Sequence, residues 1–344
     1  MKKVFCITGV SGQDGSYSAE ILVELGCNVI GLTRKKNPFQ KNLGNILSSK
    51  NFRLIETNYS QNSLKKIIKD NNITHIMNFC GQSYVSKSWE MIEETIFSKS
   101  LIVSRLLNII KESETRIRLI NACSSEIFDE SKNLLNEESN LSPCNPYGCS
   151  QLLAFSLIKS IRNYSNIWAC SAILFPHESL RRDENFLFMR ILNQIDNIHL
   201  KSSNYIKIGN SSVIRDWGFA VDFVYFMLLI LLSEKPKDFC ICTGEGNSVR
   251  ELVESICSEY GMSYEKHIQV DKALSRSYEP HKVVGNNSKL INELQVSPPL
   301  KMRITIKHII ENRKRLLNEN LTLDKITDFL DQEKLSNLEY LLNK

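Results

Sequence analysis

Three glycines with regular spacing lie near the start of the sequence. The segment Gly9-Val10-Ser11-Gly12-Gln13-Asp14-Gly15 follows a short apolar run and precedes a stretch with apolar residues at helical spacing. Glycines in a strand-to-helix turn let the backbone approach a pyrophosphate, and the free N–H groups at the start of the helix attract anions. The spacing predicts a dinucleotide site, although a tight turn without a ligand is the alternative. Its predicted members are Gly9, Ser11, Gly12, Gln13, Asp14 and Gly15.

A basic cluster follows the second predicted strand. Thr33-Arg34-Lys35-Lys36 occupies the position where a site for NAD normally carries an acidic residue that binds the ribose hydroxyls. Positive side chains at this position suit the 2′-phosphate of NADP instead. We therefore expect Arg34 and Lys35 to bind NADP in preference to NAD; the alternative is a solvated charged face.

The elements that must position these residues alternate between strands and helices. Strands are predicted at residues 4–8, 27–32, 73–79, 118–123 and 168–174, and helices at residues 17–25 and 151–164. This rhythm is typical of an α/β fold, a Rossmann-type doubly wound parallel sheet. Beyond about residue 175 the rhythm loosens, so we expect a smaller C-terminal substrate-binding region. We assign residues 1–174 and 213–245 to the NADP-binding domain and residues 175–212 and 246–344 to that region.

Composition limits the classes of function. The chain has 344 residues, of which 42% are hydrophobic and 24% charged, with a net charge of +5. The charge excess is mild, and lysine-rich patches lack interleaved aromatic residues, so no nucleic-acid partner is expected. The longest apolar run, residues 223–232, is too short to span a membrane, which needs roughly twenty residues. We expect a cytoplasmic protein with no membrane partner.

Ten cysteines are present without a CxxC pair. They are expected to be reduced, buried thiols. Cys240 and Cys242 alternate on a predicted strand at residues 238–243 with no histidine nearby, which favours packing over metal binding. No metal site is predicted.

Several longer strings resemble one known family. The Ser124-Ser125-Glu126 and Asn145-Pro146-Tyr147 segments, with the N-terminal glycines, resemble the extended short-chain dehydrogenases/reductases. A closer resemblance to the GDP-mannose 4,6-dehydratases is carried by residues 7–17, 82–85, 173–182 and 215–220, which contain the strings GQDGSY, HESLRR and RDWG. It runs collinearly from residue 4 to about residue 310. This resemblance implies a lyase that removes water from a GDP-sugar and uses tightly held NADP.

The family chemistry suggests roles for three residues. In that chemistry a tyrosine takes the proton of the sugar 4-hydroxyl while a hydride passes from C4 to NADP. A carboxylate then takes the C5 proton, water leaves from C6, and the hydride returns to C6. The resemblance implies that Tyr147 is the first base and Glu126 the C5 base, and that Ser124, where the family usually has threonine, assists proton transfer. Their joint placement after predicted strands favours a site over three unrelated polar residues.

The resemblance implies further contacts. Expected cofactor contacts outside the glycine turn and the basic cluster are Tyr147, Gln151, His177 and Arg182. Expected substrate contacts are Arg190 and Arg215 on the diphosphate, Arg276 and Glu279 on ribose or guanine, and Ser83 and Glu178 near the sugar. Arginine suits a diphosphate because its planar fork donates two parallel hydrogen bonds. The substrate would be GDP-mannose or a GDP-heptose, and the protein a homodimer or homotetramer.

Gln151 is the largest departure from the family pattern. That pattern is YxxxK, so a lysine would stand four residues after Tyr147. The lysine hydrogen-bonds the nicotinamide ribose and, through its positive charge, makes the tyrosine a better base. Glutamine can do the first but not the second, and a tyrosine with its ordinary pKa of about 10 is a poor base at neutral pH. A slowed dehydratase, a repurposed enzyme, a silent paralogue and an introduced or erroneous lysine-to-glutamine change all fit this departure.

Two alternatives to a dehydratase remain open. One is a GDP-4-keto-sugar reductase or an epimerase on the same scaffold, but a simple reductase has no C5 proton for Glu126 to remove. The other is a non-catalytic sugar-nucleotide-binding paralogue, which Gln151 favours. The retention of Ser124, Glu126 and Tyr147 argues against it.

Overall fold

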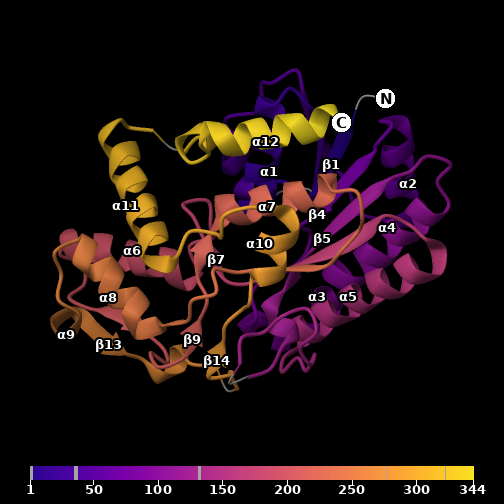
Figure 1. Ribbon diagram of the computed structural model, residues 1–344. Coiled ribbons are helices and arrows are strands. Elements are labelled where there is room, and N and C mark those ends of the chain that lie inside the picture. The colour runs from indigo at the N-terminus through magenta and orange to yellow at the C-terminus, as the bar shows by residue number, and fades with distance from the viewer. Residues whose placement is uncertain (1–2, 35–37, 131–132, 277, 322) are drawn as a thin grey trace.

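A seven-stranded parallel sheet forms the centre of the protein (Figure 1). The computed structural model describes residues 3–34, 38–130, 133–276, 278–321 and 323–344. The strand order is β11-β6-β5-β4-β1-β2-β3, so the chain reverses direction across the sheet between β1 and β4. In sequence order the strands are β1 (Val4–Thr8), β2 (Asn28–Thr33), β3 (Phe52–Glu56), β4 (His75–Asn78), β5 (Arg118–Ser124), β6 (Ala169–Leu174) and β11 (Phe239–Ile241).

Two layers of helices cover the two faces of this sheet. In β1, Phe5 and Ile7 belong to one buried cluster and Cys6 to the other, as the alternation of side chains along a strand requires. The first cluster packs under α1 (Gln13–Glu24) and α7 (Ala220–Leu232), and every residue of α7 is buried. The second cluster packs under α2 (Gln61–Asp70), α4 (Ile102–Lys111) and α5 (Pro146–Ser165).

The smaller part of the protein lies beside the carboxyl ends of the strands, at the left in Figure 1. Its helices and strands are α6 (Leu187–His199), β8 (Ile206–Ile208), β9 (Ile214–Arg215), β12 (Asn247–Ser248), α8 (Val249–Glu259), α9 (Tyr264–His267), β13 (Ile268–Val270), β14 (Lys282–Val283) and α11 (Met302–Asn318). The short strands β7 (His177–Glu178) and β10 (Gly218–Phe219) pair in parallel between the two parts. The remaining helices are α3 (Ile92–Ile96), α10 (Ser288–Leu294) and α12 (Gln332–Asn343).

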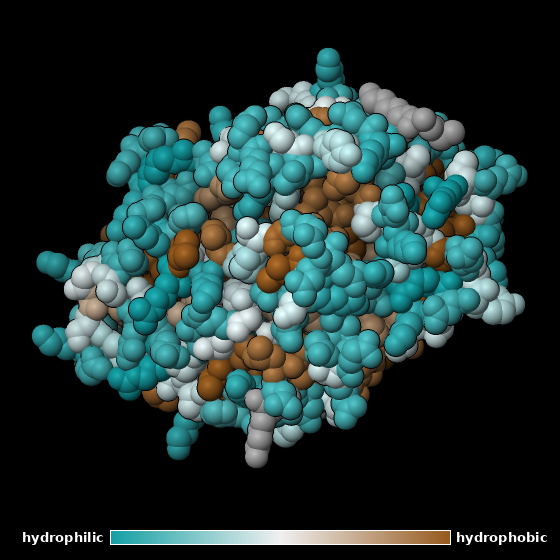
Figure 2. All heavy atoms as spheres, viewed as in Figure 1, coloured by the Kyte–Doolittle hydropathy of each residue, from teal (hydrophilic) through white to brown (hydrophobic). Residues whose placement is uncertain are grey.

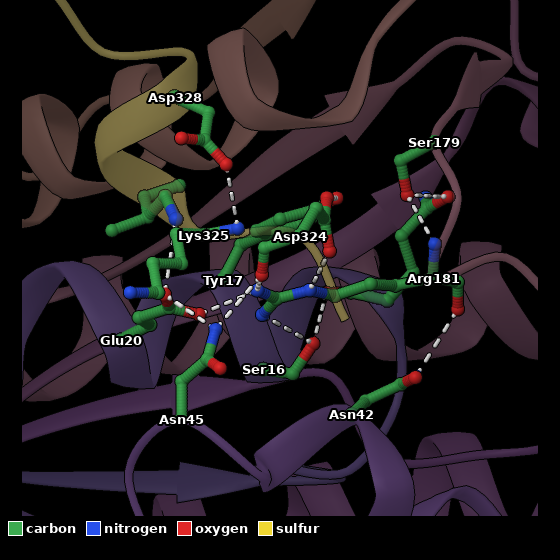
Figure 3. A network of polar contacts seen from close by, with 12 residues as sticks. Ser16, Tyr17, Glu20, Asn42, Asn45, Ser179, Arg181, Asp324, Lys325 and Asp328 are labelled. Atoms are coloured by element: carbon green, nitrogen blue, oxygen red, sulfur yellow. Dashed lines mark hydrogen bonds and ion pairs between the residues drawn. The ribbon is translucent and has the colours of Figure 1, made fainter. Parts of the chain in front are cut away.

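The C-terminal segment returns to the large sheet. Helix α12 lies over α7 (Figure 1), and Asp324 reaches α1, where it accepts a hydrogen bond from Tyr17 Oη. Arg181 lies between Asp324 and Glu20 of α1: its Nε donates to Asp324 Oδ1 over 2.8 Å and its Nη2 to Glu20 Oε2 over 2.5 Å (Figure 3). The side chains of these three residues are at most 3% exposed. The end of the chain is therefore fixed to the helix that follows the glycine turn.

The Rossmann-type fold is confirmed, with corrections to element boundaries. The strand at residues 4–8 is confirmed, but α1 begins at Gln13 and not at residue 17, and α5 begins at Pro146 and not at residue 151. Helix α1 therefore begins within the glycine motif, and α5 begins within the Asn145-Pro146-Tyr147 motif, in each case before the residue at which the helix was predicted to begin. Strand β3 was not predicted. The division into two regions stays a prediction.

The polar surface and the free cysteines agree with the expectations drawn from the composition. Charged and polar residues dominate the face in Figure 2, and hydrophobic residues come into view mainly in furrows between them. All ten cysteines are free and eight of them are buried. No helix within the described ranges is long and apolar enough to cross a membrane.

Candidate functional site

A cavity of about 740 Å³ opens at the carboxyl end of the parallel sheet. Segments that follow β1, β2, β4, β5 and β6 all contribute to its wall, as expected for ligand binding near a reversal of strand order. The predicted site residues that line it are Gly9, Ser11, Gly12, Gln13, Asp14, Gly15, Arg34, Ser83, Ser124, Glu126, Tyr147, Gln151, His177, Glu178, Arg182, Arg215, Arg276 and Glu279.

Two predicted residues are not part of that wall. Arg190 lies in α6, and its buried Nε has no hydrogen-bond partner among the described residues. It does not line the cavity, so its role on the diphosphate stays a prediction. Lys35 lies outside the described residues.

The glycine turn is closely packed against the start of α1. Gly9 has a φ of +65°, a conformation that favours glycine. A Cβ on Gly15 would stand 2.4 Å from the carbonyl oxygen of Gly9, so a side chain there would force the turn away from the helix. Gly12 precedes the helix in an extended conformation and gives it no side-chain cap. The first amide groups of α1 therefore suit an anionic ligand.

Asp14 and His177 connect the glycine turn to the segment after β6. His177 Nε2 lies 3.1 Å from Asp14 Oδ1, its Nδ1 lies 2.7 Å from the carbonyl oxygen of Phe175, and its ring stacks on Phe223. Burial alone would raise the pKa of Asp14, but His177 and Arg182 outweigh that effect and lower it to about 2. The pair holds the wall of the cavity in place.

Arg34 stands at the rim of the cavity. Its Nη1 lies 2.8 Å from Glu94 Oε1, and its side chain is 62% exposed. An exposed ion pair of this kind is weak, so the guanidinium group is available to a phosphate group.

Ser124 and Glu126 lie where β5 ends. Ser124 Oγ accepts a hydrogen bond from the Glu126 amide over 3.2 Å, which caps the short helical turn at Ser125–Ile127. Glu126 Oε2 accepts a hydrogen bond from Asn145 Nδ2 over 2.7 Å. Asn145 also caps α5, since its Oδ1 accepts from the Gly148 amide. The carboxylate is therefore oriented by the residue that starts the helix of Tyr147.

Tyr147 and Gln151 face each other one helical turn apart on α5. Gln151 Nε2 donates a hydrogen bond to Tyr147 Oη over 2.9 Å, while Gln151 Oε1 is buried and has no partner among the described residues. A Cβ on Gly148 would stand 2.2 Å from the carbonyl oxygen of Glu126, so this glycine allows α5 to approach the Glu126 backbone. The phenol and the carboxylate consequently share one end of the cavity.

Four charged groups of alternating sign extend from Glu126 along the cavity wall. Glu126 Oε1 lies 3.2 Å from Arg276 Nη1, which lies 3.4 Å from Glu279 Oε1, and that oxygen accepts from Arg215 Nη2 over 3.1 Å. Burial lowers the pKa of Arg215, and Glu279 opposes that shift. The two arginines provide the density of positive charge that a nucleoside diphosphate requires.

Glu178 lies deeper in the cavity beside Arg182. Glu178 Oε2 is buried and has no hydrogen-bond partner within the described ranges. It lies 3.8 Å from Arg182 Nε. Burial raises the pKa of Glu178, and the nearby Arg182 limits that rise. Ser83 is exposed at the opposite rim.

Lys99 is a cavity residue that the sequence reasoning missed. It is only 6% exposed, and its Nζ lies 5.7 Å from the centre of the Tyr147 ring. Thr95, Ile102 and Leu106, which stand at helical spacing from it, are buried as well. A lysine on an otherwise buried helical stripe was the sequence feature that could have revealed it.

The comparisons with known proteins agree with this geometry. A family profile described as GDP-mannose 4,6 dehydratase matches residues 6–309. The chain is 31% identical over 350 residues to GDP-mannose 4,6 dehydratase of Cricetulus griseus, covering 93% of each chain. It is 32% identical over 302 residues to GDP-mannose 4,6-dehydratase of Yersinia enterocolitica, covering 83% of this chain and 81% of the relative.

Solved structures share the fold at low sequence identity. A UDP-glucose 4-epimerase of Thermotoga maritima, solved with UDP-glucose, superposes with a TM-score of 0.81 at 17% identity, covering 91% of this chain and 99% of the other. A dTDP-glucose 4,6-dehydratase of Bacillus anthracis, solved with NAD, gives 0.80 at 16% identity, covering 91% and 97%. These likenesses establish the Rossmann-type fold, and the profile match over most of the sequence establishes that the chain belongs to the GDP-mannose 4,6-dehydratase family.

Proposed function

We propose that this protein is a GDP-sugar 4,6-dehydratase, a hydro-lyase that acts on GDP-mannose or a related GDP-hexose or GDP-heptose. The observation that carries the proposal is the convergence of Tyr147, Glu126 and Ser124 at one end of the cavity. A phenol and a carboxylate held together by Asn145 and Gly148 suit two successive proton removals from one sugar, the first from the 4-hydroxyl and the second from the neighbouring C5.

Each side chain has a distinct task in this chemistry. Tyr147 takes the proton of the 4-hydroxyl as C4 is oxidised. The resulting ketone acidifies the C5 proton, which Glu126 removes as the C6 hydroxyl departs with a proton as water. Ser124 stands two residues before Glu126 and bonds its amide, so its hydroxyl assists proton transfer at the same place. A bound nicotinamide cofactor supplies the oxidation at C4 and the reduction at C6.

The residues of the glycine turn fit such a cofactor. The close approach of Gly15 to Gly9 leaves room for a pyrophosphate beside the backbone. Gln151 Oε1, which has no hydrogen-bond partner within the described ranges, can accept a hydrogen bond from a ribose hydroxyl. We favour NADP over NAD because Arg34 is exposed at the rim where a 2′-phosphate would lie. Comparison of the affinities of the two cofactors for the purified protein tests this choice.

Arg215 suits the diphosphate of the substrate, and Arg276 suits its ribose or guanine. The charges of Glu126 and Glu279 hold both arginines in place until an anionic ligand competes for them. Arg276 then exchanges the Glu126 carboxylate for ligand oxygens, which leaves Glu126 able to accept a proton.

The proposal is tested by incubating the purified protein with NADP and GDP-mannose in deuterated water. We expect mass spectrometry to show a product lighter by one water and carrying deuterium at C5, because Glu126 returns a solvent-derived proton. Tyr147→Phe is the matched control and should abolish the product. Water loss only after Gln151→Lys would mean that this position silences the site. If neither the unmutated protein nor the Gln151→Lys variant removes water from GDP-mannose or from a GDP-heptose, the proposal is overturned.

We further propose a homo-oligomer that associates through the cofactor domain. Apolar side chains are exposed on α3 and α5: Met91, Ile92 and Ile96 on and beside α3, and Leu153 on α5. Contiguous exposed apolar residues on a folded domain mark interaction sites. Light scattering on the purified protein distinguishes the expected dimer or tetramer from a monomer.

We propose a cytoplasmic location for the protein. The free, mostly buried cysteines fit a reducing compartment. Cell fractionation followed by immunodetection tests the location.

A further inference from the structure

The site presents an electrostatic problem. If the protein works as proposed, Tyr147 must lose its proton near neutral pH, yet the residue one turn along the helix is the uncharged Gln151. Glutamine donates a hydrogen bond to Tyr147 Oη but adds no positive charge. A cation elsewhere in the cavity wall would supply the charge that Gln151 lacks.

Lys99 is held inside the cavity wall by an unusual helical turn. It lies in a π-helical turn (Phe97–Leu101) between α3 and α4, a type of turn that is frequent at functional sites. Its aliphatic stem packs over Gly81, where a Cβ would stand 2.5 Å from Lys99 Cδ. Gly81 also has a φ of +132°, so glycine is required there for two reasons.

The turn that carries Lys99 is fixed to the helix that carries Tyr147. Ser100 Oγ donates to the carbonyl oxygen of Ser150 over 2.7 Å, and both residues are buried. The neighbouring Ser98 Oγ accepts from the Gln82 amide. The distance of 5.7 Å from Lys99 Nζ to the Tyr147 ring is thus set by packed backbone and not by a flexible loop.

The groups around Lys99 leave its charge uncompensated. Within the described part of the chain no carboxylate pairs with Lys99, since Glu94 pairs with Arg34 and Glu126 with Arg276. Burial raises the pKa of the adjacent Cys80 thiol, and raises that of Cys123 to about 12, so both thiols stay neutral. A deprotonated Tyr147 would place a negative charge beside this ammonium group, and the two charges attract each other.

We infer that Lys99 and Gln151 divide between them the task that one lysine performs in the family pattern: Lys99 supplies the positive charge and Gln151 the hydrogen bond. Lys99 is thus a positioning residue that stabilises the tyrosinate of Tyr147. The inference deepens the proposed function and rests on it for its consequence in catalysis.

The direct test needs no turnover. The ionisation of Tyr147 is followed by near-ultraviolet absorbance, as the difference between each protein and the same protein with Tyr147→Phe. We expect Lys99→Met to move the midpoint of this titration to higher pH, because the positive charge that favours the phenolate is lost. Lys99→Arg should keep the original midpoint. Where Lys99→Met fails to fold, Lys99→Gln takes its place.

Lys111 provides a matched control on the same helical segment. Its Nζ lies 5.4 Å from the ring centre of Tyr164, but Tyr164 is 82% exposed. Lys111→Met should leave the Tyr147 titration unchanged. An unchanged midpoint in Lys99→Met, or an equal shift in Lys111→Met, overturns the inference.

The catalytic test separates the inference from the proposed function. We expect Lys99→Met to lower kcat on the order of a hundredfold at neutral pH and to move the pH–rate profile to higher pH. Lys99→Met combined with Gln151→Lys should restore much of the rate, because a charge returns beside the phenol. A shifted titration without any water loss in the unmutated protein would uphold the inference and refute the function. Turnover by the unmutated protein together with an unshifted pH–rate profile in Lys99→Met would uphold the function and refute the inference.

Discussion

Two clusters of arginines and carboxylates differ in their exposure to solvent. The buried cluster consists of Arg181, Glu20 and Asp324, whose side chains are at most 3% exposed (Figure 3). The cavity cluster consists of Arg215, Arg276, Glu279 and Glu126, whose side chains are 10% to 36% exposed. The same chemical groups therefore occur once in a closed arrangement and once in an open one.

The difference shows how burial separates a structural charge from a binding charge. In the buried cluster Arg181 also donates to the Asp324 carbonyl oxygen and stacks on Tyr17, so its guanidinium group has no room for a ligand. In the cavity cluster Arg276 shares its donors between two carboxylates at longer distances and faces the cavity. Charges of the first kind hold elements together, and charges of the second kind can be exchanged with a ligand.

The largest effect is expected from Arg181→Met. Removal of this side chain leaves Glu20 and Asp324 buried without a counter-ion, which should lower the free energy of unfolding by about 3–5 kcal/mol. Urea unfolding measures this loss. Arg315→Met is the control, because Arg315 pairs with Asp328 at the surface and should contribute less than about 1 kcal/mol. Equal losses in the two variants would show that the buried cluster is not structural.

An intermediate, pH-dependent effect is expected from Asp14→Asn, on the cavity side of α1. His177 and Arg182 outweigh burial and lower the pKa of Asp14 from 3.8 to about 2. A carboxyl group whose pKa is lower in the folded protein than in the unfolded chain stabilises the fold at pH values above its unfolded pKa. That stabilisation is lost as the pH falls towards 2. The variant should be less stable than the parent by about 2 kcal/mol near pH 6.

The pH series is the check on this prediction. Urea unfolding at about pH 6 and about pH 3 should show the difference between parent and variant narrowing at the lower pH. A difference that stays constant across the series would mean that Asp14 acts through packing and not through its charge.

The smallest effect is expected from Arg276→Met, in the open cluster. Loss of one charged donor to the diphosphate or ribose should raise the KM for GDP-mannose about tenfold. The urea midpoint should hardly change, because the partners of Arg276 remain accessible to water. Steady-state kinetics and urea unfolding on one preparation give both numbers. A marked loss of stability with an unchanged KM would place Arg276 with the structural charges.

Much of the fold followed from local patterns in the sequence. Strand β1 and the glycine turn are encoded within residues 4–15, because buried strand residues and required glycines are adjacent there. Tyr147 and Glu126 were proposed because the sequence resembles family motifs that contain them, and both residues line the cavity. Strand β3 was missed because it lies at the edge of the sheet, where its exposed positions weaken the apolar pattern.

The contacts that depend on remote segments were not predictable. Nothing near Asp324 in the sequence indicates that it meets Tyr17 and Arg181, since that contact depends on the path of the C-terminal segment. The sequence shows Lys99 only as a lysine on an otherwise buried helical stripe; its proximity to Tyr147 could not be predicted, because Tyr147 belongs to another helix.

The order in which the ribosome makes the chain determines when the ion cluster around Arg181 can form. Tyr17 and Asp324 are separated by 307 positions in the sequence, and Arg181 and Asp324 by 143. Because α1 is synthesised first, Glu20 has no Arg181 to pair with until residue 181 has been made. The complete cluster cannot form until Asp324 has been made. Contacts between such distant segments form late, since a large loop has to close before they stabilise anything. In the nascent chain, α1 therefore lacks these partners until nearly all of the sequence has been made.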